Sequence, residues 1–392
     1  MTNIVIVAAK RTPIGSFQGI LSTVKTPHLG GAAIKGVIES IGLDLQTVDD
    51  VYMGCVLPAG LGQAPARQAS IVAGLPTKTP CTTVNKVCGS GLKSIMLGAD
   101  QILSGHAKTI IAGGMENMSG APYMLEKARG GYRLGHGTIY DHMFLDGLED
   151  SYSAPGTAMG IFAERTADHY KFTRAQQDAF ALESSLRAIN AMKSGAFEAE
   201  ITPVTISSKK GDQVISIDET PGKVDPAKIP QLRAAFRDGG TVTAANSSSI
   251  SDGAAAVVLM SQEEATRQGH KALASIKGYA SVAQEPEWFT TAPVKAIQKV
   301  CEQVGWSVDD VDLYEINEAF AVVTMAAMHD LKIPHNKVNI AGGACALGHP
   351  IGASGARILV TLIHSLHRLG KKKGIATLCI GGGEAVAMAI EI

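Results

Sequence analysis

The sequence predicts an α/β protein made of two similar halves, with an additional segment inserted into the first half. Three observations support this prediction. Short motifs recur in one order about 260 residues apart, strand-like and helix-like patterns alternate in each half, and residues 119–243 have no counterpart in the second half. Alternation of strands and helices is typical of sheets whose strands are mostly parallel and are connected by helices.

The first recurring motif follows a helical pattern and leads into a strand. Residues 41–51 read IGLDLQTVDDV and residues 304–311 read VGWSVDDV, so that the stretch VDDV returns 260 residues later. The preceding segments, 29–41 and 294–304, both have the apolar spacing of an amphipathic helix. The motif therefore predicts a helix followed by a strand in each half.

The second recurring motif is a glycine-rich turn at the start of a long helical pattern. CGSGL at residues 88–92 matches GASGA at residues 352–356, an offset of 264. In both halves the helical pattern gives way to an apolar strand with a glycine pair, IIAGG at 110–114 and LCIGG at 378–382. Four elements in one order at nearly one offset indicate a duplication.

The unmatched interval, residues 119–243, is predicted to be an insertion on the first half. It is richer in charged residues, tyrosine and turn-forming residues than the segments around it. Within it, Thr173 precedes a helical pattern and Gln176 lies three residues later. This is the spacing of a capping box, in which each side chain binds the backbone N–H of the other residue. We therefore expect an amphipathic helix to begin there.

Composition and charge restrict the classes of function. Hydrophobic residues make up 45% of the 392 residues and charged residues 18%, which is typical of a well-packed globular protein. A net charge of −1 argues against nucleic-acid binding, which usually requires a basic surface. No apolar run reaches the roughly 18 residues of a membrane span, and the N-terminus has no signal-peptide pattern. The six cysteines lack zinc-site or disulfide spacing, so we expect free cysteines, no metal and a cytoplasmic location.

Cys88 is a candidate nucleophile because of its position at a turn. It follows a predicted strand at residues 82–87 and precedes a helix that begins near Gly89. Backbone N–H groups and the positive end of the helix dipole stabilise a thiolate at such a turn. A free thiol is ionised to only a few per cent at neutral pH, so this activation matters. The alternative is a small buried cysteine, the commonest role of this residue type.

Three further residues lie at similar junctions. His349 precedes a proline, which disfavours a helical conformation, so we expect it on a glycine-lined loop that meets Cys88 between the halves. Cys379 ends an apolar strand before three glycines, whose N–H groups suit an oxyanion hole. Asn317 follows a predicted strand. Each has a structural alternative: a hydrogen-bonded histidine, a buried cysteine and a helix N-cap. Active sites of α/β folds form at strand ends, and this joint placement favours an enzyme.

The assembled motifs resemble the thiolase family over essentially the whole chain. The stretches that carry the resemblance are NKVCGSGLKSI at 85–95, GGMENMS at 113–119, NEAF at 317–320, the glycine-rich segment 342–357, and CIGGGE at 379–384. The resemblance implies a thiolase-like five-layered α-β-α-β-α fold of two duplicated halves with an inserted loop domain. The expected domains are an N-terminal half at 1–118 plus 244–269, the loop domain at 119–243, and a C-terminal half at 270–392.

The resemblance also implies a ping-pong transfer of acetyl groups between coenzyme A thioesters. Activated by His349, Cys88 would take an acetyl group from acetyl-CoA and release CoA. Cys379 would then remove a proton from the methyl group of a second acetyl-CoA, and the carbanion would attack the acyl-enzyme to give acetoacetyl-CoA. His349 and a water held by Asn317 resemble one oxyanion hole of the family. The backbone N–H groups of Cys88 and Gly381 resemble the other.

Similar matching assigns the substrate channel. The residues expected to line it are Leu148, Met159, Phe236, Ala244, Ser248, Phe289, Ala319 and Phe320. Two departures bear on CoA contacts and acyl length: Ala158 replaces a histidine of bacterial biosynthetic members, and Phe289 replaces a methionine of some short-chain members. The resemblance implies no cofactor besides the CoA thioester substrates, a role in lipid metabolism, and a homo-oligomer, either a dimer or a tetramer with contacts from the insertion.

Two related activities are alternatives to this reading. A 3-ketoacyl-CoA thiolase of broader chain length, acting in fatty-acid degradation, differs only in the lining of its pocket, so it stays open. A decarboxylating ketoacyl synthase fits less well, because that group resembles a cysteine with two histidines and the second position here is Asn317.

Overall fold

The centre of the protein is a mixed sheet in which two halves repeat one strand order. A computed structural model describes residues 2–208, 211–223 and 225–392. In the first half the order is β4 (Cys81–Val84), β3 (Asp50–Gly54), β5 (Thr109–Asn117), β10 (Ser251–Ser261) and β1 (Ile4–Arg11). In the second half it is β12 (Leu313–Ile316), β13 (Lys373–Ile380), β14 (Glu384–Glu391) and β11 (Ala274–Ala283). A short pairing of β1 with β11 joins the two halves.

The pairing directions agree between the halves and correct one prediction. β3 with β5, and β12 with β13, pair in parallel, whereas the next two pairings in each half are antiparallel. The expectation of mostly parallel strands is therefore wrong. In the second half the reason is the tight glycine turn at residues 381–383, because two strands joined by so short a turn must run antiparallel. The counterpart of β4 is a single parallel bridge between Tyr314 and Val338.

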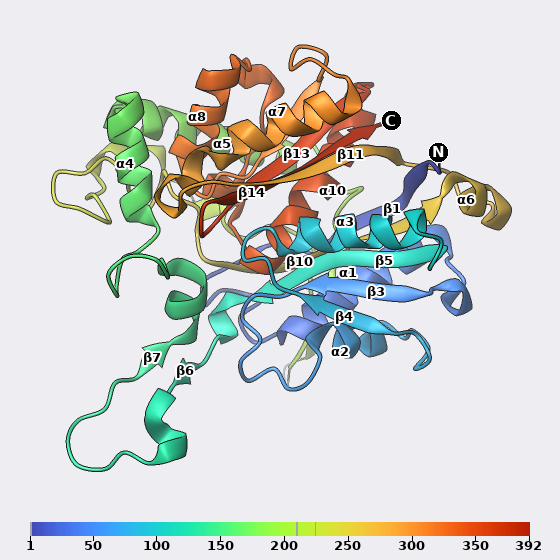
Figure 1. Cartoon of the computed structure of the whole chain (residues 1–392), viewed down its shortest axis with the longest axis horizontal. Helices are drawn as coiled ribbons and strands as arrows, with labels where there is room; N and C mark the ends of the chain where they lie inside the picture. Colours follow the sequence, from blue (N-terminus) through green and yellow to red (C-terminus); the bar gives the residue numbers. More distant parts are fainter. Residues whose placement is uncertain (1, 209–210, 224) are drawn as a thin grey trace.

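Helices on both faces of each half produce five layers, as Figure 1 shows. The outer layers are α1 (Thr26–Ile41) with α2 (Pro65–Val72) on the first half, and α7 (Ala292–Val304) with α8 (Ala321–Leu331) on the second. The middle layer consists of α3 (Ser90–Leu103) and α10 (Ile351–Leu369), which contact each other and strands of both halves. The five-layered fold is thus confirmed.

The middle layer forms because both helices carry apolar residues at helical spacing. In α3, Leu92, Ile95, Ala99 and Ile102 are buried. Burial of each larger side chain contributes about 1.5–3 kcal/mol. α10 is buried over most of its surface and begins at Ile351, directly after Pro350 and five residues before the apolar pattern from residue 356 indicated.

Glycines allow α3 and α10 to cross closely at their N-terminal ends. A Cβ atom at Gly91 would lie 2.8 Å from the Ala356 nitrogen, and one at Gly355 would lie 2.5 Å from the Leu92 nitrogen. Real Cβ atoms are not found this close to backbone, so only glycine fits at these two positions. The crossing therefore places the turns that precede the two helices at one end of the middle layer.

The insertion after β5 contains a projecting hairpin, two helices and a second hairpin. Its elements are β6 (Tyr123–Met124), β7 (Tyr140–Asp141), α4 (Gly160–Tyr170), α5 (Arg174–Lys193), β8 (Val204–Ser208) and β9 (Gly211–Ile215). The β6–β7 hairpin extends away from the layered body (Figure 1). The predicted capping box begins α5: Gln176 N–H donates to the Thr173 hydroxyl at 3.3 Å, and Thr173 N–H donates to the Gln176 side chain at 2.8 Å. The bounds of the three domains stay a prediction.

Further short elements include β2 (Gly15–Ser16), α6 (Gln262–Gln268), α9 (Ala344–Leu347), the π-helical turn η4 (Phe144–Leu148) and the 3-10 turn η7 (Pro286–Thr291). None of the helices in the described ranges combines the length with the hydropathy that crossing a bilayer requires. All six cysteines are free.

Candidate active site

Cys88 lies in a tight turn between β4 and α3. β4 ends at Val84, three residues earlier than the sequence predicted, because the Ser90 side chain diverts the backbone from the sheet: its oxygen accepts the Lys86 N–H at 2.8 Å and donates to the Val87 carbonyl at 2.7 Å. Val87 has a φ of 46°, a left-handed conformation that is unfavourable for a β-branched residue. Such strain is concentrated at functional sites.

Burial, rather than the helix dipole, dominates the ionisation of Cys88. Its half-buried side chain has a pKa raised to about 11, mainly because burial disfavours the thiolate. The backbone N–H groups of Gly381 and of Cys88 itself lower this pKa, and the nearby Glu116 raises it. The activated thiolate that the turn predicted is therefore not the resting form. The thiol keeps its proton at neutral pH, and a base must accept that proton during attack.

His349 lies on the loop before α10 and has the properties of that base. Burial and the Arg357 cation lower its pKa to about 3, so the ring is neutral. Its Nδ1 lies 2.5 Å from the Ser354 hydroxyl oxygen, whose own proton is donated to the Pro350 carbonyl at 2.9 Å. Nδ1 therefore carries the ring proton, and the lone pair is on Nε2. In the described part of the chain Nε2 is buried and has no hydrogen-bond partner.

Asn317 lies beside this histidine and does not cap a helix. α8 begins at Ala321 with Phe320 as its N-cap residue, so the N-cap interpretation of Asn317 is wrong. The Asn317 Nδ2 atom lies 3.4 Å from Nδ1 of His349. Its Oδ1 atom is buried and has no hydrogen-bond partner among the described residues. A buried amide oxygen without a partner is the kind of group that holds an ordered water.

Cys379 and Gly381 lie at the end of β13. Cys379 is fully buried, and both this burial and the adjacent Cys88 sulfur raise its pKa. The turn that follows requires glycine: Gly382 and Gly383 both have a φ of 89°, and a Cβ atom at Gly383 would lie 2.2 Å from the Gln284 carbonyl oxygen. The Gly381 N–H lies close enough to the Cys88 sulfur to lower the pKa of that thiol. Two thiols and a backbone donor thus meet at one point.

Two adjoining cavities lead to this point. The inner cavity, of about 60 Å³, is lined by Cys88, His349 and Gly381 together with Val87, Gly147, Leu148, Met159, Ser248, Phe289, Ala319, Phe320 and Ile351. The outer cavity, of about 540 Å³, shares Leu148, Met159, Ser248, Ala319 and Phe320 with it and adds, among others, Phe236 and Ala244. Every residue that the sequence placed in the substrate channel lines one of these cavities.

The lining residues are fixed by contacts of the first half and its insertion with the second half. Ser248 N–H donates to the Ala319 carbonyl at 2.9 Å. The Phe236 ring packs edge-on against Phe320 at 5.9 Å, and Phe289 packs in the same way against Phe162 at 6.2 Å. The sequence analysis missed Val87, Gly147 and Ile351 as lining residues, although they lie next to or near predicted ones in the chain. Their positions next to or near Cys88, Leu148 and His349 in the chain could have identified them as lining residues.

Glu116, on β5, is a fully buried carboxylate that the sequence analysis did not single out. It accepts backbone N–H groups from Val56 at 2.9 Å, Leu57 at 3.2 Å and Gly352 at 2.9 Å. These bonds tie the first turn of α10 to the first half of the protein. Burial raises the pKa of Glu116 to about 7. Its signal in the sequence is only its place in the GGMENMS stretch.

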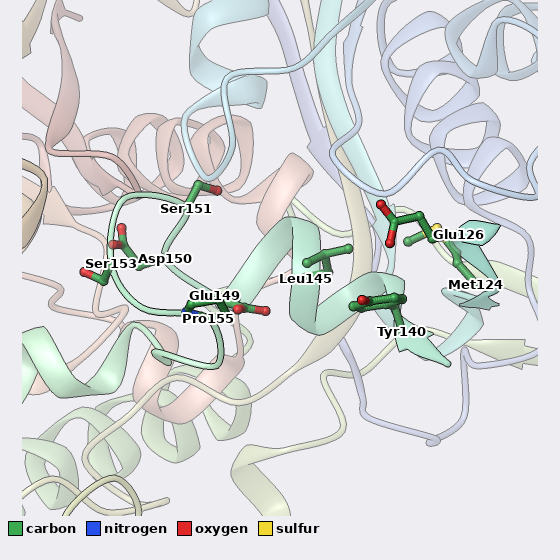
Figure 2. A pocket seen from close by; sticks show the side chains of 9 residues that line it. All are labelled: Met124, Glu126, Tyr140, Leu145, Glu149, Asp150, Ser151, Ser153 and Pro155. Carbon is green, nitrogen blue, oxygen red and sulfur yellow. The ribbon is translucent and has the colours of Figure 1, made fainter. Parts of the chain in front are cut away.

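A separate hollow of about 490 Å³ lies near the projecting hairpin. Figure 2 shows the side chains that line it: Met124, Glu126, Tyr140, Leu145, Glu149, Asp150, Ser151, Ser153 and Pro155. They come from the hairpin, η4 and the loop that follows η4. The lining contains neither a cysteine nor a histidine, so this hollow offers no thiol nucleophile and no imidazole base for acyl transfer. Within the described ranges no group of three His, Cys, Asp or Glu residues is arranged to hold a metal ion.

Comparisons with known proteins agree with this geometry. Residues 4–263 match the model of the thiolase N-terminal domain, and residues 270–392 match that of the thiolase C-terminal domain. An acetyl-CoA acetyltransferase from Chromobacterium violaceum is 50% identical over 99% of both chains. One from Escherichia coli is 51% identical over 100% of this chain and 99% of its own. The crystal structure of the Bacillus anthracis acetyl-CoA acetyltransferase superimposes with a TM-score of 0.97 at 42% identity, covering 100% of this chain and 99% of its own.

Proposed function

This chain belongs to the thiolase family of acyltransferases, and from that premise we propose that it condenses two acetyl-CoA molecules reversibly to acetoacetyl-CoA and CoA. The observation that carries the proposal is the meeting of Cys88, His349 and Gly381 around a cavity of about 60 Å³. An acyl group attached to the sulfur would lie in this cavity, and the larger apolar cavity behind it suits a pantetheine arm. Relatives named acetyl-CoA acetyltransferase, about 50% identical over their whole length, support the same reaction.

In the first half-reaction the Cys88 sulfur attacks the thioester carbonyl of acetyl-CoA. Its proton passes to the unpartnered Nε2 of His349, which is neutral and able to accept it. The thiolate of CoA leaves, takes this proton back from His349 and departs as the free thiol. The N–H groups of Gly381 and Cys88 stabilise the negative oxygen of the tetrahedral intermediate, and removal of one such donor typically raises a barrier by about 2.7–4 kcal/mol.

In the second half-reaction the Cys379 thiol gives its proton to Nε2 of His349 and, as the thiolate, removes a proton from the methyl group of a second acetyl-CoA. Acylation of Cys88 favours this step, because an acylated sulfur cannot carry the charge that raises the pKa of Cys379. The enolate oxygen lies between His349 and a water bound to the free Oδ1 of Asn317. The carbanion then attacks the acetyl group, the Cys88 sulfur leaves with the proton that Cys379 has taken, and Cys379 recovers its own proton from His349. These groups need no cofactor.

The main alternative is a 3-ketoacyl-CoA thiolase of broader chain length. Its chemistry uses the same residues, so only the space beside the sulfur distinguishes the two activities. The inner cavity is about one ninth of the volume of the outer one, and the buried Phe289 closes part of it. This difference favours acetyl and acetoacetyl groups over longer chains.

The same proposal includes a homo-oligomer that acts in the lipid metabolism of the cytoplasm. The projecting hairpin exposes large apolar side chains: Tyr123 is 70% exposed, Ile139 63%, and Leu134 is fully exposed. Concentrated exposure of this kind is typical of protein–protein contact surfaces. It supports contacts between copies through the insertion, in a dimer or a tetramer. Six free cysteines are consistent with a reducing compartment.

The proposal is tested by detecting the acetyl-enzyme. Brief incubation with acetyl-CoA, followed by intact-protein mass analysis, should add one acetyl group. Cys88→Ala should abolish the addition, whereas Cys301→Ala, which removes a buried cysteine of α7, should keep it. An acetyl group that survives Cys88→Ala would exclude Cys88 as the acyl carrier and with it the proposed mechanism.

A further inference from the structure

The turn between β4 and α3, which carries Cys88, and the glycine turn at residues 381–383 come from opposite halves of the protein. They lie against each other at two points inside the site. Gly381 and Cys88 line the same inner cavity, and the Gly381 N–H lowers the pKa of the Cys88 thiol. Beside it, a Cβ atom at Gly89 would lie 2.4 Å from Cδ1 of Ile380, so the two turns are packed as closely as a glycine permits. Neither contact restrains the glycine turn along its length, because residues 381–383 have no side chains of their own.

A third contact lies at the edge of the site and is made by side chains that have no part in the proposed chemistry. Lys86 Nζ pairs with a carboxylate oxygen of Glu384. Lys86 stands two residues before Cys88, and Glu384 directly follows the glycine turn at the start of β14. The two side chains are 23% and 36% exposed. This ion pair therefore links the bases of the two turns.

The glycine turn is also anchored by backbone contacts. Gln284 N–H donates to the Gly383 carbonyl at 2.8 Å, and the Gln284 carbonyl lies against Gly383. Gln284 and Lys86 thus hold the adjacent residues Gly383 and Glu384 at the C-terminal end of the turn, and the N-terminal end is held by the pairing of Ile380 with Glu384. Loss of either anchor would let a turn without side chains move away from Cys88.

We propose that Lys86 and Glu384 are positioning residues that hold the Gly381 N–H at the Cys88 sulfur. The inference deepens the proposed function and rests on it for its catalytic meaning. The pair acts through backbone geometry, not through its own charges, and a displacement of about 1 Å at an oriented donor can lower a rate substantially. Because the pair is partly exposed, its contribution to stability is small. Its removal should therefore affect reactivity far more than folding.

The effect of Glu384→Gln on Cys88 distinguishes positioning from a direct charge effect. If Glu384 acted only through its charge, its neutralisation would favour the thiolate and speed alkylation of Cys88. If it positions Gly381, loss of the N–H contact would raise the thiol pKa and slow alkylation. Loss worth about one pKa unit lowers the thiolate fraction tenfold, and the higher nucleophilicity of the remaining thiolate leaves a net slowing of about threefold.

The experiment measures iodoacetamide labelling of the Cys88 peptide at pH 8 in the full chain. We expect Lys86→Met and Glu384→Gln each to slow it about threefold. Exchange of the charges, Lys86→Glu with Glu384→Lys, should restore it to within about twofold of the unchanged protein. The matched control is Lys277→Met, which breaks the similarly exposed Lys277–Glu391 pair at the opposite end of β14 and should have no effect. Unchanged or faster labelling in Glu384→Gln, or no rescue by the exchange, would overturn the proposal.

Steady-state thiolysis of acetoacetyl-CoA supplies the second readout. The single variants should lose about tenfold in kcat, with KM changed less than twofold and Tm lowered by no more than about 4 °C. A loss of kcat that follows Tm would instead indicate a general structural role and overturn the proposal. The labelling measurement needs no acyl-CoA substrate. It therefore tests the positioning pair even if the protein proves not to have the proposed activity.

Discussion

Replacement of Phe289 tests how strictly the inner cavity limits acyl length. Phe289 is 3% exposed and lines the cavity of about 60 Å³ over Cys88. Thiolysis of acetoacetyl-CoA leaves an acetyl group on the sulfur, whereas 3-ketohexanoyl-CoA leaves a butanoyl group, which is two methylenes longer. Each misplaced methylene in an apolar pocket typically costs about 1–3 kcal/mol. Two therefore cost about 2–6 kcal/mol, a preference of about thirtyfold to 10⁴-fold in kcat/KM.

Phe289→Ala should reduce this preference by removing the ring. We expect the ratio of kcat/KM for acetoacetyl-CoA to that for 3-ketohexanoyl-CoA to fall at least tenfold. The ring also packs against Phe162, so the variant should lose about 3–5 kcal/mol of unfolding free energy. The assay is therefore run at 15 °C. Phe289→Leu serves as a milder variant, and its kcat/KM ratio should lie between those of the unchanged protein and of Phe289→Ala.

A variant in the outer cavity serves as the control, and longer substrates test whether the reasoning from cavity size is correct. Phe236 lines only the outer cavity, so Phe236→Ala should lower kcat/KM for both substrates alike and leave their ratio unchanged. If the unchanged protein were equally efficient on four-carbon and eight-carbon ketoacyl-CoA, the reasoning from cavity size would be refuted. The broader degradative thiolase would then be the better description.

Four further outcomes are expected. Cys379→Ser should still form the acetyl-enzyme but lose condensation at least a hundredfold, and equal loss of both half-reactions would point to a structural role. His349→Ala should slow acetylation of Cys88 by about 10²–10⁴-fold in rapid-quench mass analysis. Because the pKa of Glu116 is raised to about 7, its stabilising effect is present below about pH 4.5 and is lost as the pH rises through 7. The unfolding free energy, measured with urea, should therefore fall between pH 4.5 and 8. In Glu116→Gln this fall should be smaller than in the unchanged protein, by up to about 3 kcal/mol. Leu134→Glu, at the fully exposed tip of the hairpin, should dissociate the proposed oligomer in light scattering while leaving Tm unchanged.

Local features were predictable because their causes lie close together in the chain. The capping box of Thr173 and Gln176 spans three residues, and the helices after Cys88 and His349 follow from apolar spacing and glycine-rich turns. The repeated order of elements was also visible, because duplication preserves it. The five-layered fold and the family followed from these motifs together.

Features that depend on distant residues were not predictable. The pKa of Cys88 is set by burial between both halves, which outweighs the N–H groups of its own turn. Glu116 binds backbone 236 residues away at Gly352, and Lys86 pairs with Glu384 across 298 residues. Strand direction was missed for a related reason: apolar runs of β10 and β14 look alike in either direction, and only the connections decide it.

The site's division between the halves also affects how the protein is made. Cys88 is synthesised early, but Gly381 follows 293 residues later, and at about 5–20 residues per second this takes about 15–60 s. During that time the growing chain displays the Cys88 thiol without the His349 ring and the Gly381 N–H. β14, which follows β13 after only three residues, must then insert between β13 and β11. The candidate site is therefore completed only when the second half has folded against the first.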